Sequence, residues 1–317
     1  MKNVLLPERL DTAGEAMLEG RANVLRCAGT DERSLCEAAP EADGIVLRSK
    51  ARITDAVLAC APRLRVVSRT GVGIDNIDVD ACSRHGVMVC YLPGINAYAV
   101  AEHTIALMLA QLKQLPLMDR SVRGGGWAIR TKNIPQDASG KALGILGLGR
   151  IGREVATRAR AFGMTIIGYD PYVKQAEGVE WAEMDDVIAR ADVLTLHLPE
   201  SEATRHIIND ERIAKMKPSA IIINASRGGV IDTAALVAAL KDGRIAGAAL
   251  DVFESEPPGA GDALMGLDNV ILTPHVAALT EQCGATMMRE AVKRLLIAFE
   301  GGTPPDIANA EALGISQ

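Results

Sequence analysis

Three polar residues in the second half of the chain are spaced so that each follows a predicted β-strand. Arg227 lies in NASRGGVID, Glu256 in DVFESEPP and His275 in NVILTPH. Arginine presents a planar fork that matches a carboxylate. Histidine titrates near neutrality and serves as an acid or a base, above all beside a carboxylate that holds its charged form. Each residue alone is typical of a structural position, but the set predicts a site that binds an organic acid and moves a proton on it.

A glycine-rich segment precedes these residues. In LGILGLGRIGREVATRA, Gly147, Gly149 and Gly152 have the spacing G-x-G-x-x-G between a predicted strand and a predicted helix. In that context the glycines allow a tight turn, and the helix N-terminus faces a pyrophosphate. Asp170 stands 18 residues after Gly152, where a carboxylate accepts ribose hydroxyls and repels a 2′-phosphate. The pattern therefore predicts a dinucleotide site that prefers NAD to NADP.

Together these features match the requirements for oxidising a 2-hydroxy acid. The reaction needs a group that holds the carboxylate, a base for the hydroxyl proton and a cofactor that takes the hydride. We assign the first role to Arg227 and the second to His275, with Glu256 as the partner of His275.

Two series of short apolar runs must position these side chains. The first series is NVLL, GIVLRS, RVVSRT and VMVCYL, and the second is LGIL, MTIIGYD, DVLTLHL, AIIINAS, IAGAALDVF and NVILTPH. Because they alternate with helical segments, we expect α/β structure with two doubly wound parallel sheets. We also predict helices from Ala97 to Leu115, between an N-cap at Asp232 and a C-cap at Gly243, and from about Ala278 to Glu300.

The composition limits the classes of partner. The 317 residues carry a net charge of −6, with 48% hydrophobic and 23% charged residues, as in a globular protein of two domains. They show no basic patch for nucleic acid, no signal-peptide core and no apolar run near a membrane span. The six cysteines lack metal-ligand spacing, so we expect reduced thiols and no metal. We expect a cytoplasmic protein without nucleic-acid or membrane partners.

Beyond single motifs, the chain resembles the D-isomer-specific 2-hydroxyacid dehydrogenases. The matching stretches are VSRTGVGIDNID, PGINAYAVAEHTIALMLA, LGILGLGRIGREVA, HLPESEAT, INASRGGVID, GAALDVFESEPP and NVILTPH. The resemblance implies an NAD-dependent oxidoreductase acting on CH–OH donors. It also implies a Rossmann cofactor domain, residues 99–282, inserted into a flavodoxin-like substrate domain made of residues 1–98 and 283–317. Members of this family are usually homodimers through the cofactor domain.

The resemblance also carries over individual residues. It implies Arg227, Glu256 and His275 as the catalytic set. The cofactor contacts that it implies besides the glycines are Val72, Arg150, Ile151, Asp170, Leu198, Ala225, Asp251, Ala277 and Ala278. After His275 this chain has VAAL where many relatives have one or two glycines, so the resemblance does not define the backbone conformation of this segment. The formate-oxidising branch has Gln in place of Glu256, which disfavours that chemistry. We expect His197 near the cofactor and give no catalytic role to His85, His103 and His206.

The substrate is less defined. LRSKARIT and VSRTGVGIDNID resemble the phosphoglycerate dehydrogenase branch, in which arginines at these positions meet the phosphate. The substrate contacts that we expect are Arg48, Arg69, Gly71, Val72, Gly73 and Arg227. The leading candidate is 3-phosphoglycerate, with glycerate, a glyoxylate or hydroxypyruvate reductase activity, and sulfolactate as alternatives. We expect no C-terminal regulatory domain. A rival of another class is an NAD-sensing corepressor-like interaction protein, against which the lack of an extended polar tail argues.

Overall fold

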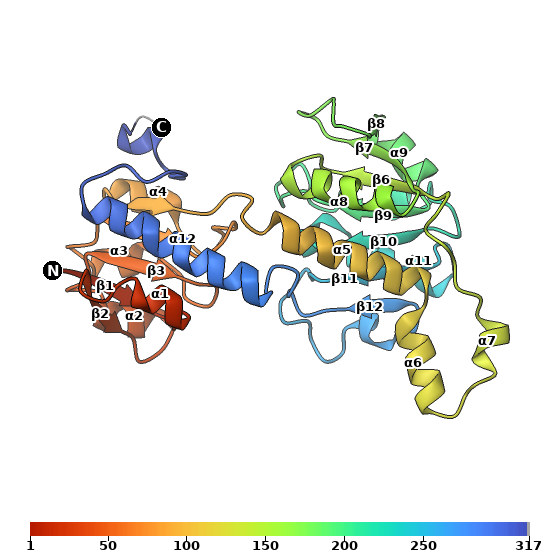
Figure 1. Ribbon diagram of the computed structural model, residues 1–317, viewed down its shortest axis with the longest axis horizontal. Helices are drawn as coiled ribbons and strands as arrows, with labels where there is room; N and C mark the ends of the chain where they lie inside the picture. The colour runs from red at the N-terminus through yellow and green to blue at the C-terminus, as the bar shows by residue number, and fades with distance from the viewer. Residues whose placement is uncertain (316–317) are drawn as a thin grey trace. The chain divides into compact units, whose positions relative to one another are not determined.

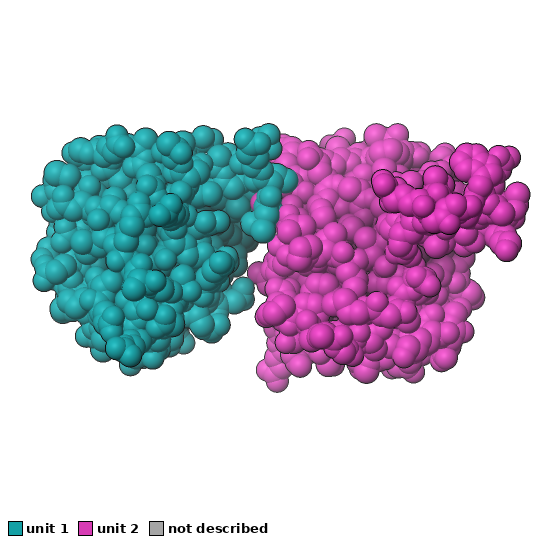
Figure 2. Space-filling view, turned by 90° about the horizontal axis from the view of Figure 1, so that it is seen from below, with its two compact units in different colours: residues 1–96, 279–317 teal, residues 97–278 magenta. Residues whose placement is uncertain are grey.

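The computed structural model describes residues 1–315 and divides into two compact units (Figures 1 and 2). Unit 1 contains Met1–Asn96 and the chain from Leu279 onward, and unit 2 is Ala97–Ala278. The chain passes between the units where helices begin, at Ala97 and just before Glu281. The junctions expected after residues 98 and 282 lie two and four residues further along, inside those helices. Within residues 1–315, every helix is too short or too polar to cross a membrane.

Unit 1 contains a five-stranded parallel sheet in the order β2-β1-β3-β4-β5, which is the flavodoxin order and confirms the expected fold. The strands are β1 (Lys2–Leu6), β2 (Ala22–Arg26), β3 (Gly44–Leu47), β4 (Val66–Arg69) and β5 (Met88–Cys90). One face is covered by α2 (Glu32–Ala38), α3 (Asp55–Ala59) and α4 (Val79–Arg84), and the other by α1 (Thr12–Ala16) and α12 (Glu281–Phe299). The apolar pattern missed β2 because this edge strand is largely exposed.

Unit 2 contains a seven-stranded parallel sheet in the order β12-β11-β10-β9-β6-β7-β8. The strands are β6 (Ala142–Leu146), β7 (Thr165–Tyr169), β8 (Glu180–Trp181), β9 (Val193–Leu196), β10 (Ile221–Asn224), β11 (Gly247–Leu250) and β12 (Val270–Leu272). The strand order reverses direction between β6 and β9, as in a Rossmann fold, which confirms the expected class. Only the two-residue strand β8 was not predicted.

Helices cover both faces of the second sheet (Figure 1). One face packs against α5 (Ala97–Leu112) and α8 (Arg150–Ala161), and the other against α9 (Met184–Arg190), α10 (Asp210–Ile213) and α11 (Thr233–Lys241). The remaining helical segments of unit 2 are α6 (Leu115–Arg123), α7 (Ile129–Lys132), η1 (Gly228–Val230) and η2 (Ala263–Gly266). The short segment η3 (Glu311–Leu313) belongs to unit 1.

Three predicted helix boundaries are corrected. The helix expected to reach Leu115 ends at Leu112, because Gln114 adopts a left-handed backbone with φ 51° before α6 begins. The N-cap at Asp232 is confirmed, but the C-cap of α11 is Asp242, and Gly243 follows it with φ 67°. The last helix begins at Glu281 and not near Ala278, since the Thr280 side chain caps it.

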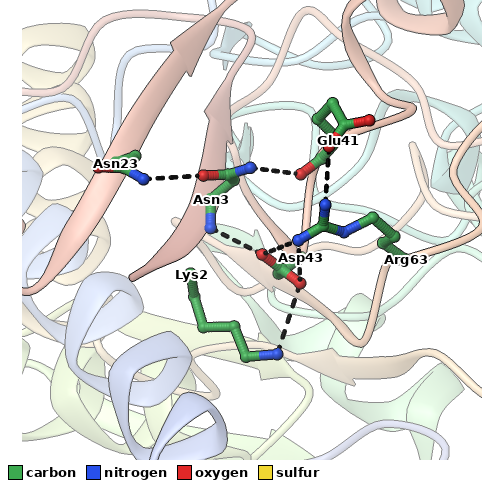
Figure 3. A network of polar contacts seen from close by, with 6 residues as sticks. All are labelled: Lys2, Asn3, Asn23, Glu41, Asp43 and Arg63. Atoms are coloured by element: carbon green, nitrogen blue, oxygen red, sulfur yellow. Dashed lines mark hydrogen bonds and ion pairs between the residues drawn. The ribbon is translucent and has the colours of Figure 1, made fainter.

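At the amino end of each sheet, an aspartate accepts a backbone N–H from a neighbouring strand; Asp43 is buried and Asp192 is partly buried. In unit 1, Asp43 precedes β3 and accepts the backbone N–H of Asn3 at 2.8 Å, while Lys2 and Arg63 also contact its carboxylate (Figure 3). Burial raises the pKa of Asp43, but these donors outweigh burial, so the net pKa lies below its ordinary value. In unit 2, Asp192 precedes β9 and accepts the N–H of Ala142 at 2.8 Å, and its pKa is also lowered. In both sheets, therefore, an aspartate side chain ties the start of one strand to the backbone of its neighbour.

Replacing Asp43 by Asn is expected to reduce the free energy of unfolding by about 2 kcal/mol at pH 7, because charge-assisted hydrogen bonds are lost at a buried site. A carboxylate whose folded pKa is depressed stabilises the protein above its unfolded pKa of about 3.9, and that stability disappears as the pH falls through the folded pKa. The difference between wild type and Asp43→Asn should therefore shrink in acid. Urea unfolding from neutral to acid pH tests this.

The control is Asp268→Asn, whose side chain is 93% exposed and pairs only across the surface with Arg120. Surface ion pairs contribute about 0–1 kcal/mol, so this variant should unfold nearly as wild type. Equal destabilisation of the two variants would contradict the stabilising role of the Asp43 hydrogen bonds.

Candidate active site

Arg227, Glu256 and His275 lie at one edge of the sheet in unit 2. They follow β10, β11 and β12, which are neighbours in the sheet and run parallel. Parallel strands end at a common edge, and in doubly wound folds ligands bind outside that edge near the strand-order reversal. The glycine turn after β6 lies at this edge too. The topology therefore gathers the predicted catalytic residues and the predicted cofactor turn at one end of unit 2.

His275 and Glu256 are in direct contact. The Nδ1 atom of His275 lies 2.7 Å from Oε2 of Glu256, and the other carboxylate oxygen accepts the backbone N–H of Phe253 at 3.1 Å. The His275 and Glu256 side chains are 51% and 38% exposed. Because Glu256 occupies Nδ1, the ring presents Nε2 for exchanging a proton with a ligand. The arrangement suits general acid–base chemistry by the histidine.

Arg227 lies on a loop that packs against the loop carrying Glu256. The side chain of Asn224 donates to the Arg227 carbonyl at 2.8 Å, and Arg227 Nη1 donates to the Ser226 carbonyl at 2.8 Å. The next residue, Gly228, approaches the Phe253 backbone so closely that a Cβ there would clash with it. A glycine is therefore required after Arg227, and the packing fixes this loop against the one that precedes Glu256.

The glycine turn has the geometry of a dinucleotide cradle. Gly147 has φ 99°, and a Cβ there would clash with the carbonyl oxygen of His197. Gly152 packs equally closely on the Gly147 carbonyl, whereas Gly149, the N-cap of α8, faces open space. Open space above a helix N-terminus suits the phosphates of a dinucleotide. The residues present therefore fit NAD.

Asp170 braces this turn. The side chain is buried, and its Oδ2 atom accepts the backbone N–H of Leu148, in the glycine turn, at 2.8 Å. Its Oδ1 atom accepts the N–H groups of Tyr172 and Val173 at 2.8 and 3.0 Å. The carboxylate thus ties the end of β7 to the glycine turn, a structural role that the sequence pattern did not predict.

His197 also borders the turn. Its backbone N–H donates to the Leu146 carbonyl at 2.8 Å, and its Nε2 lies 3.1 Å from Thr195 Oγ1. Burial lowers the pKa of His197 to about 3, so the ring is neutral at physiological pH. Nδ1 is buried and has no hydrogen-bond partner within residues 1–315.

Several other expected cofactor contacts gather in unit 2. A small apolar cluster contains Val100, Ile151, Ala225, Ala277 and Ala278. Leu198 borders the position of Gly147, and Arg150 is the first residue of α8. Asp251 is fully buried beneath the segment that carries His275. Burial raises the pKa of Asp251, but His103, Thr273 and two backbone N–H groups outweigh burial, and the net pKa is lowered.

The expected substrate residues of unit 1 lie at the carboxyl ends of β3 and β4. Arg69 ends β4, and its guanidinium lies beside Gly71 in the turn that also contains Val72 and Gly73. Arg48 follows β3, but its Nη1 donates to the backbone carbonyl of Arg9 at 2.9 Å. The structure therefore places Arg69 at the TGVG turn and directs Arg48 toward a backbone carbonyl.

Sequence reasoning missed one residue beside the site. His103 on α5 contacts both Thr273 and Asp251, although it was expected to be an ordinary helix position. The available signal was weak: His103 follows Val100 by three residues, so the two side chains share one face of the helix.

Comparisons with known proteins identify the family of the chain. The model of the family described as D-isomer specific 2-hydroxyacid dehydrogenase, NAD binding domain, matches residues 105–277. A D-3-phosphoglycerate dehydrogenase of Methanocaldococcus jannaschii is 44% identical over 305 residues, 93% of this chain and 58% of that protein. The chain thus spans less than two thirds of the length of such relatives.

Solved structures resemble the chain along nearly all of its length. A glyoxylate reductase from Paecilomyes thermophila has a TM-score of 0.86 and 31% identity, covering 98% of this chain and 99% of that one. An NADPH-dependent glyoxylate/hydroxypyruvate reductase from Sinorhizobium meliloti has a TM-score of 0.89 and 28% identity, covering 100% of both chains. With the family model matching more than half of its residues, the chain belongs to the D-isomer-specific 2-hydroxyacid dehydrogenases and carries their NAD-binding domain.

Proposed function

We propose that this chain is an NAD-dependent dehydrogenase that interconverts a small D-2-hydroxy acid and its 2-oxo acid. The observation that carries the proposal is the His275–Glu256 contact of 2.7 Å at the same sheet edge as the glycine turn and Arg227. Bound NAD supplies the hydride acceptor. His275 takes the hydroxyl proton at Nε2 during oxidation and returns it during reduction, while Glu256 stabilises the charged ring. Arg227 binds the substrate carboxylate.

Among the two forms of the cofactor, we favour NAD. The Asp170 carboxylate at the end of β7 is negative and would repel a 2′-phosphate. The cation that follows it, Lys174, lies 4.0 Å from the centre of the Trp181 ring and 5.8 Å from that of Tyr169. This lysine is held over the two rings by cation–π attraction.

Wild type should prefer NAD to NADP by at least about tenfold in kcat/KM, about 1.4 kcal/mol. Asp170→Ser should reduce this ratio of kcat/KM values. Because Asp170 also braces the glycine turn, Asp170→Ser should lower Tm as well. Asp170→Asn is the second variant, since it removes the charge at nearly constant size. Its single amide oxygen can accept the Leu148 N–H only by turning the NH2 group toward the N–H groups of Tyr172 and Val173, so it should narrow the preference for NAD and also lower Tm. Equal use of both cofactors by wild type would contradict the assignment.

For the substrate, we propose an acid with a second anionic group, with 3-phosphoglycerate as the leading candidate. Support comes from two arginines at the carboxyl ends of neighbouring strands in unit 1 and from relatives named D-3-phosphoglycerate dehydrogenase. Charge-assisted contacts contribute about 1.5 to 3 kcal/mol each. Glyoxylate and hydroxypyruvate, the substrates in the names of similar reductases, are the alternatives.

The experiment that tests the function is NADH oxidation with phosphohydroxypyruvate and with glyoxylate, in wild type, Arg48→Ala and Arg69→Ala. We expect Arg69→Ala to raise KM for phosphohydroxypyruvate about tenfold or more and to leave glyoxylate nearly unaffected. Arg48→Ala should have the smaller effect, because its guanidinium donates to the Arg9 carbonyl at 2.9 Å, whereas that of Arg69 makes longer contacts, 3.3 Å to Asn76 and 3.4 Å to Thr70. Equal losses on both substrates would mean that the arginines are structural. NADH binding without turnover of any 2-oxo acid would instead favour an NAD-sensing interaction protein.

We also infer a homodimer formed through unit 2. The segment of α6 and α7 extends from the sheet layers of this unit (Figure 1), and α6 has no buried residue. Exposed apolar side chains lie along it, at Leu115, Val122, Trp127 and Ile134. Sedimentation equilibrium should show a dimer for wild type and a monomer for Val122→Asp/Trp127→Asp, while Met265→Asp, another exposed apolar position, should stay dimeric. A monomeric wild type would contradict the inference.

A cytoplasmic location is inferred from the cysteines. All six are free thiols in the structure. Proteins of oxidising compartments usually pair their cysteines, so unpaired thiols favour a reducing compartment.

A further inference from the structure

The segment that carries His275 has an unusual backbone. His275 has φ 52°, in the left-handed region that residues other than glycine rarely occupy. Such a conformation persists only where the surrounding structure over-determines it. The contacts of the neighbouring residues therefore identify what holds the His275 side chain in place.

Asp251 makes most of these contacts. Its carbonyl accepts the N–H of His275 at 2.8 Å, and its carboxylate accepts the N–H groups of Val276 and Ala277, each at 2.9 Å. The carboxylate also accepts the hydroxyl of Thr273 at 2.6 Å. The Asp251 side chain is fully buried, and a buried carboxylate needs such donors. The carboxylate and the segment 273–277 therefore hold each other in place.

His103, on α5, provides one more donor. Its Nε2 atom lies 3.1 Å from Thr273 Oγ1 and 3.5 Å from Asp251 Oδ1. A threonine hydroxyl has a single hydrogen, which Thr273 donates to Asp251, so its oxygen accepts from His103. Nε2 of His103 thus carries a proton whether the ring is neutral or charged. One turn earlier on α5, Val100 packs in the apolar cluster with Ala277, so this helix supports the segment through two contacts.

We propose that His103 is a positioning residue for His275. Its Nε2–H completes the hydrogen bonds of Thr273 and Asp251, and these fix the backbone that turns His275 toward Glu256. The inference rests on the proposed function, because it concerns the reaction in which His275 exchanges the proton. His103 acts through the segment 273–277, which separates its role from that of the catalytic pair.

Two substitutions of His103 test the proposal. His103→Leu removes the donor, whereas His103→Gln presents an amide N–H at a similar reach. With NADH and phosphohydroxypyruvate or glyoxylate, His103→Leu should lower kcat about tenfold or more with a smaller change in KM, because misplaced catalytic groups lose rate. Amide hydrogen exchange at Val276 and Ala277 should become about tenfold faster. His103→Gln should stay within about threefold of wild type in both measurements.

The matched control is His85→Leu, which removes another histidine–carboxylate contact, 3.2 Å from His85 Nε2 to Asp55 in unit 1. It should leave kcat and both exchange rates unchanged. The proposal is wrong if His103→Leu keeps kcat within about twofold of wild type, or if His103→Gln loses as much as His103→Leu at equal Tm. If wild type reduces neither 2-oxo acid, the proposed function fails, and the exchange rates still decide whether His103 holds the segment.

Discussion

Replacing His275 by alanine is expected to lower kcat by about 100-fold or more in both directions, because a positioned acid–base group contributes about 10²–10⁴-fold. The side chain is half exposed and its loop is held through backbone and Asp251 contacts, so the fold should survive its removal. The affinity for NADH should change little, since the glycine turn and Asp170 lie on other loops. Steady-state kinetics and a fluorescence titration with NADH measure the two quantities.

The matched control is His85→Ala. His85 also pairs with a carboxylate, with its Nε2 3.2 Å from Asp55, but it lies at the end of α4 in unit 1 and not on a loop after β10, β11 or β12. Loss of the His85 side chain should leave kcat within about threefold of wild type. Turnover by His275→Ala near the wild-type rate would refute the proton-transfer role.

Glu256 is expected to act through His275 and not as an independent base. Glu256→Gln keeps the size of the side chain but removes the negative charge that contacts Nδ1 of His275, so kcat for reduction at neutral pH should fall. Residues that act as one unit are not additive. The double variant Glu256→Gln/His275→Ala should therefore be no slower than His275→Ala alone.

The sequence predicted the parts of the site that depend on strand order. Arg227, Glu256 and His275 each follow an apolar strand, and parallel strands end at one edge, so the sequence alone predicts their common location. The glycine turn was also predictable, because the G-x-G-x-x-G spacing indicates a dinucleotide site when it lies between a strand and a helix. Both sheets appear with the expected topology.

The parts that the sequence did not predict depend on contacts between distant segments. His103 and Thr273 are 170 residues apart, and nothing in the local pattern of either indicates the contact. The left-handed backbone at His275 arises from the buried Asp251 and not from the residue type. Likewise, β2 lacks the apolar burial that marks the other strands of its sheet, and the helix breaks at Gln114, two residues before the sequence signal at Pro116. Exposure and long-range packing decide these features.

The prediction for Arg227, the proposed carboxylate-binding residue, is harder to test than that for His275, because the backbone around Arg227 must stay intact. Arg227→Ala is expected to lower kcat/KM for the 2-oxo acid by about 100-fold or more, since truncating one partner of a close charge pair costs about 2–5 kcal/mol. Asn224 binds the Arg227 carbonyl and Gly228 packs by its backbone, so neither contact needs the guanidinium. The hydrogen bond from Nη1 to the Ser226 carbonyl is lost with the side chain, so Tm should fall by about 2–4 °C.

Two comparisons separate carboxylate binding from a general loss of activity. Arg227→Lys keeps the charge but not the planar fork, so it should recover only part of the lost kcat/KM. Glycolaldehyde has the carbonyl of glyoxylate without the carboxylate, and wild type should already reduce it poorly. Arg227→Ala should therefore slow glyoxylate far more than glycolaldehyde. If both substrates lost rate equally, Arg227 would act on the carbonyl or on the fold, and the group that binds the carboxylate would have to be sought elsewhere, first at the TGVG turn and Arg69.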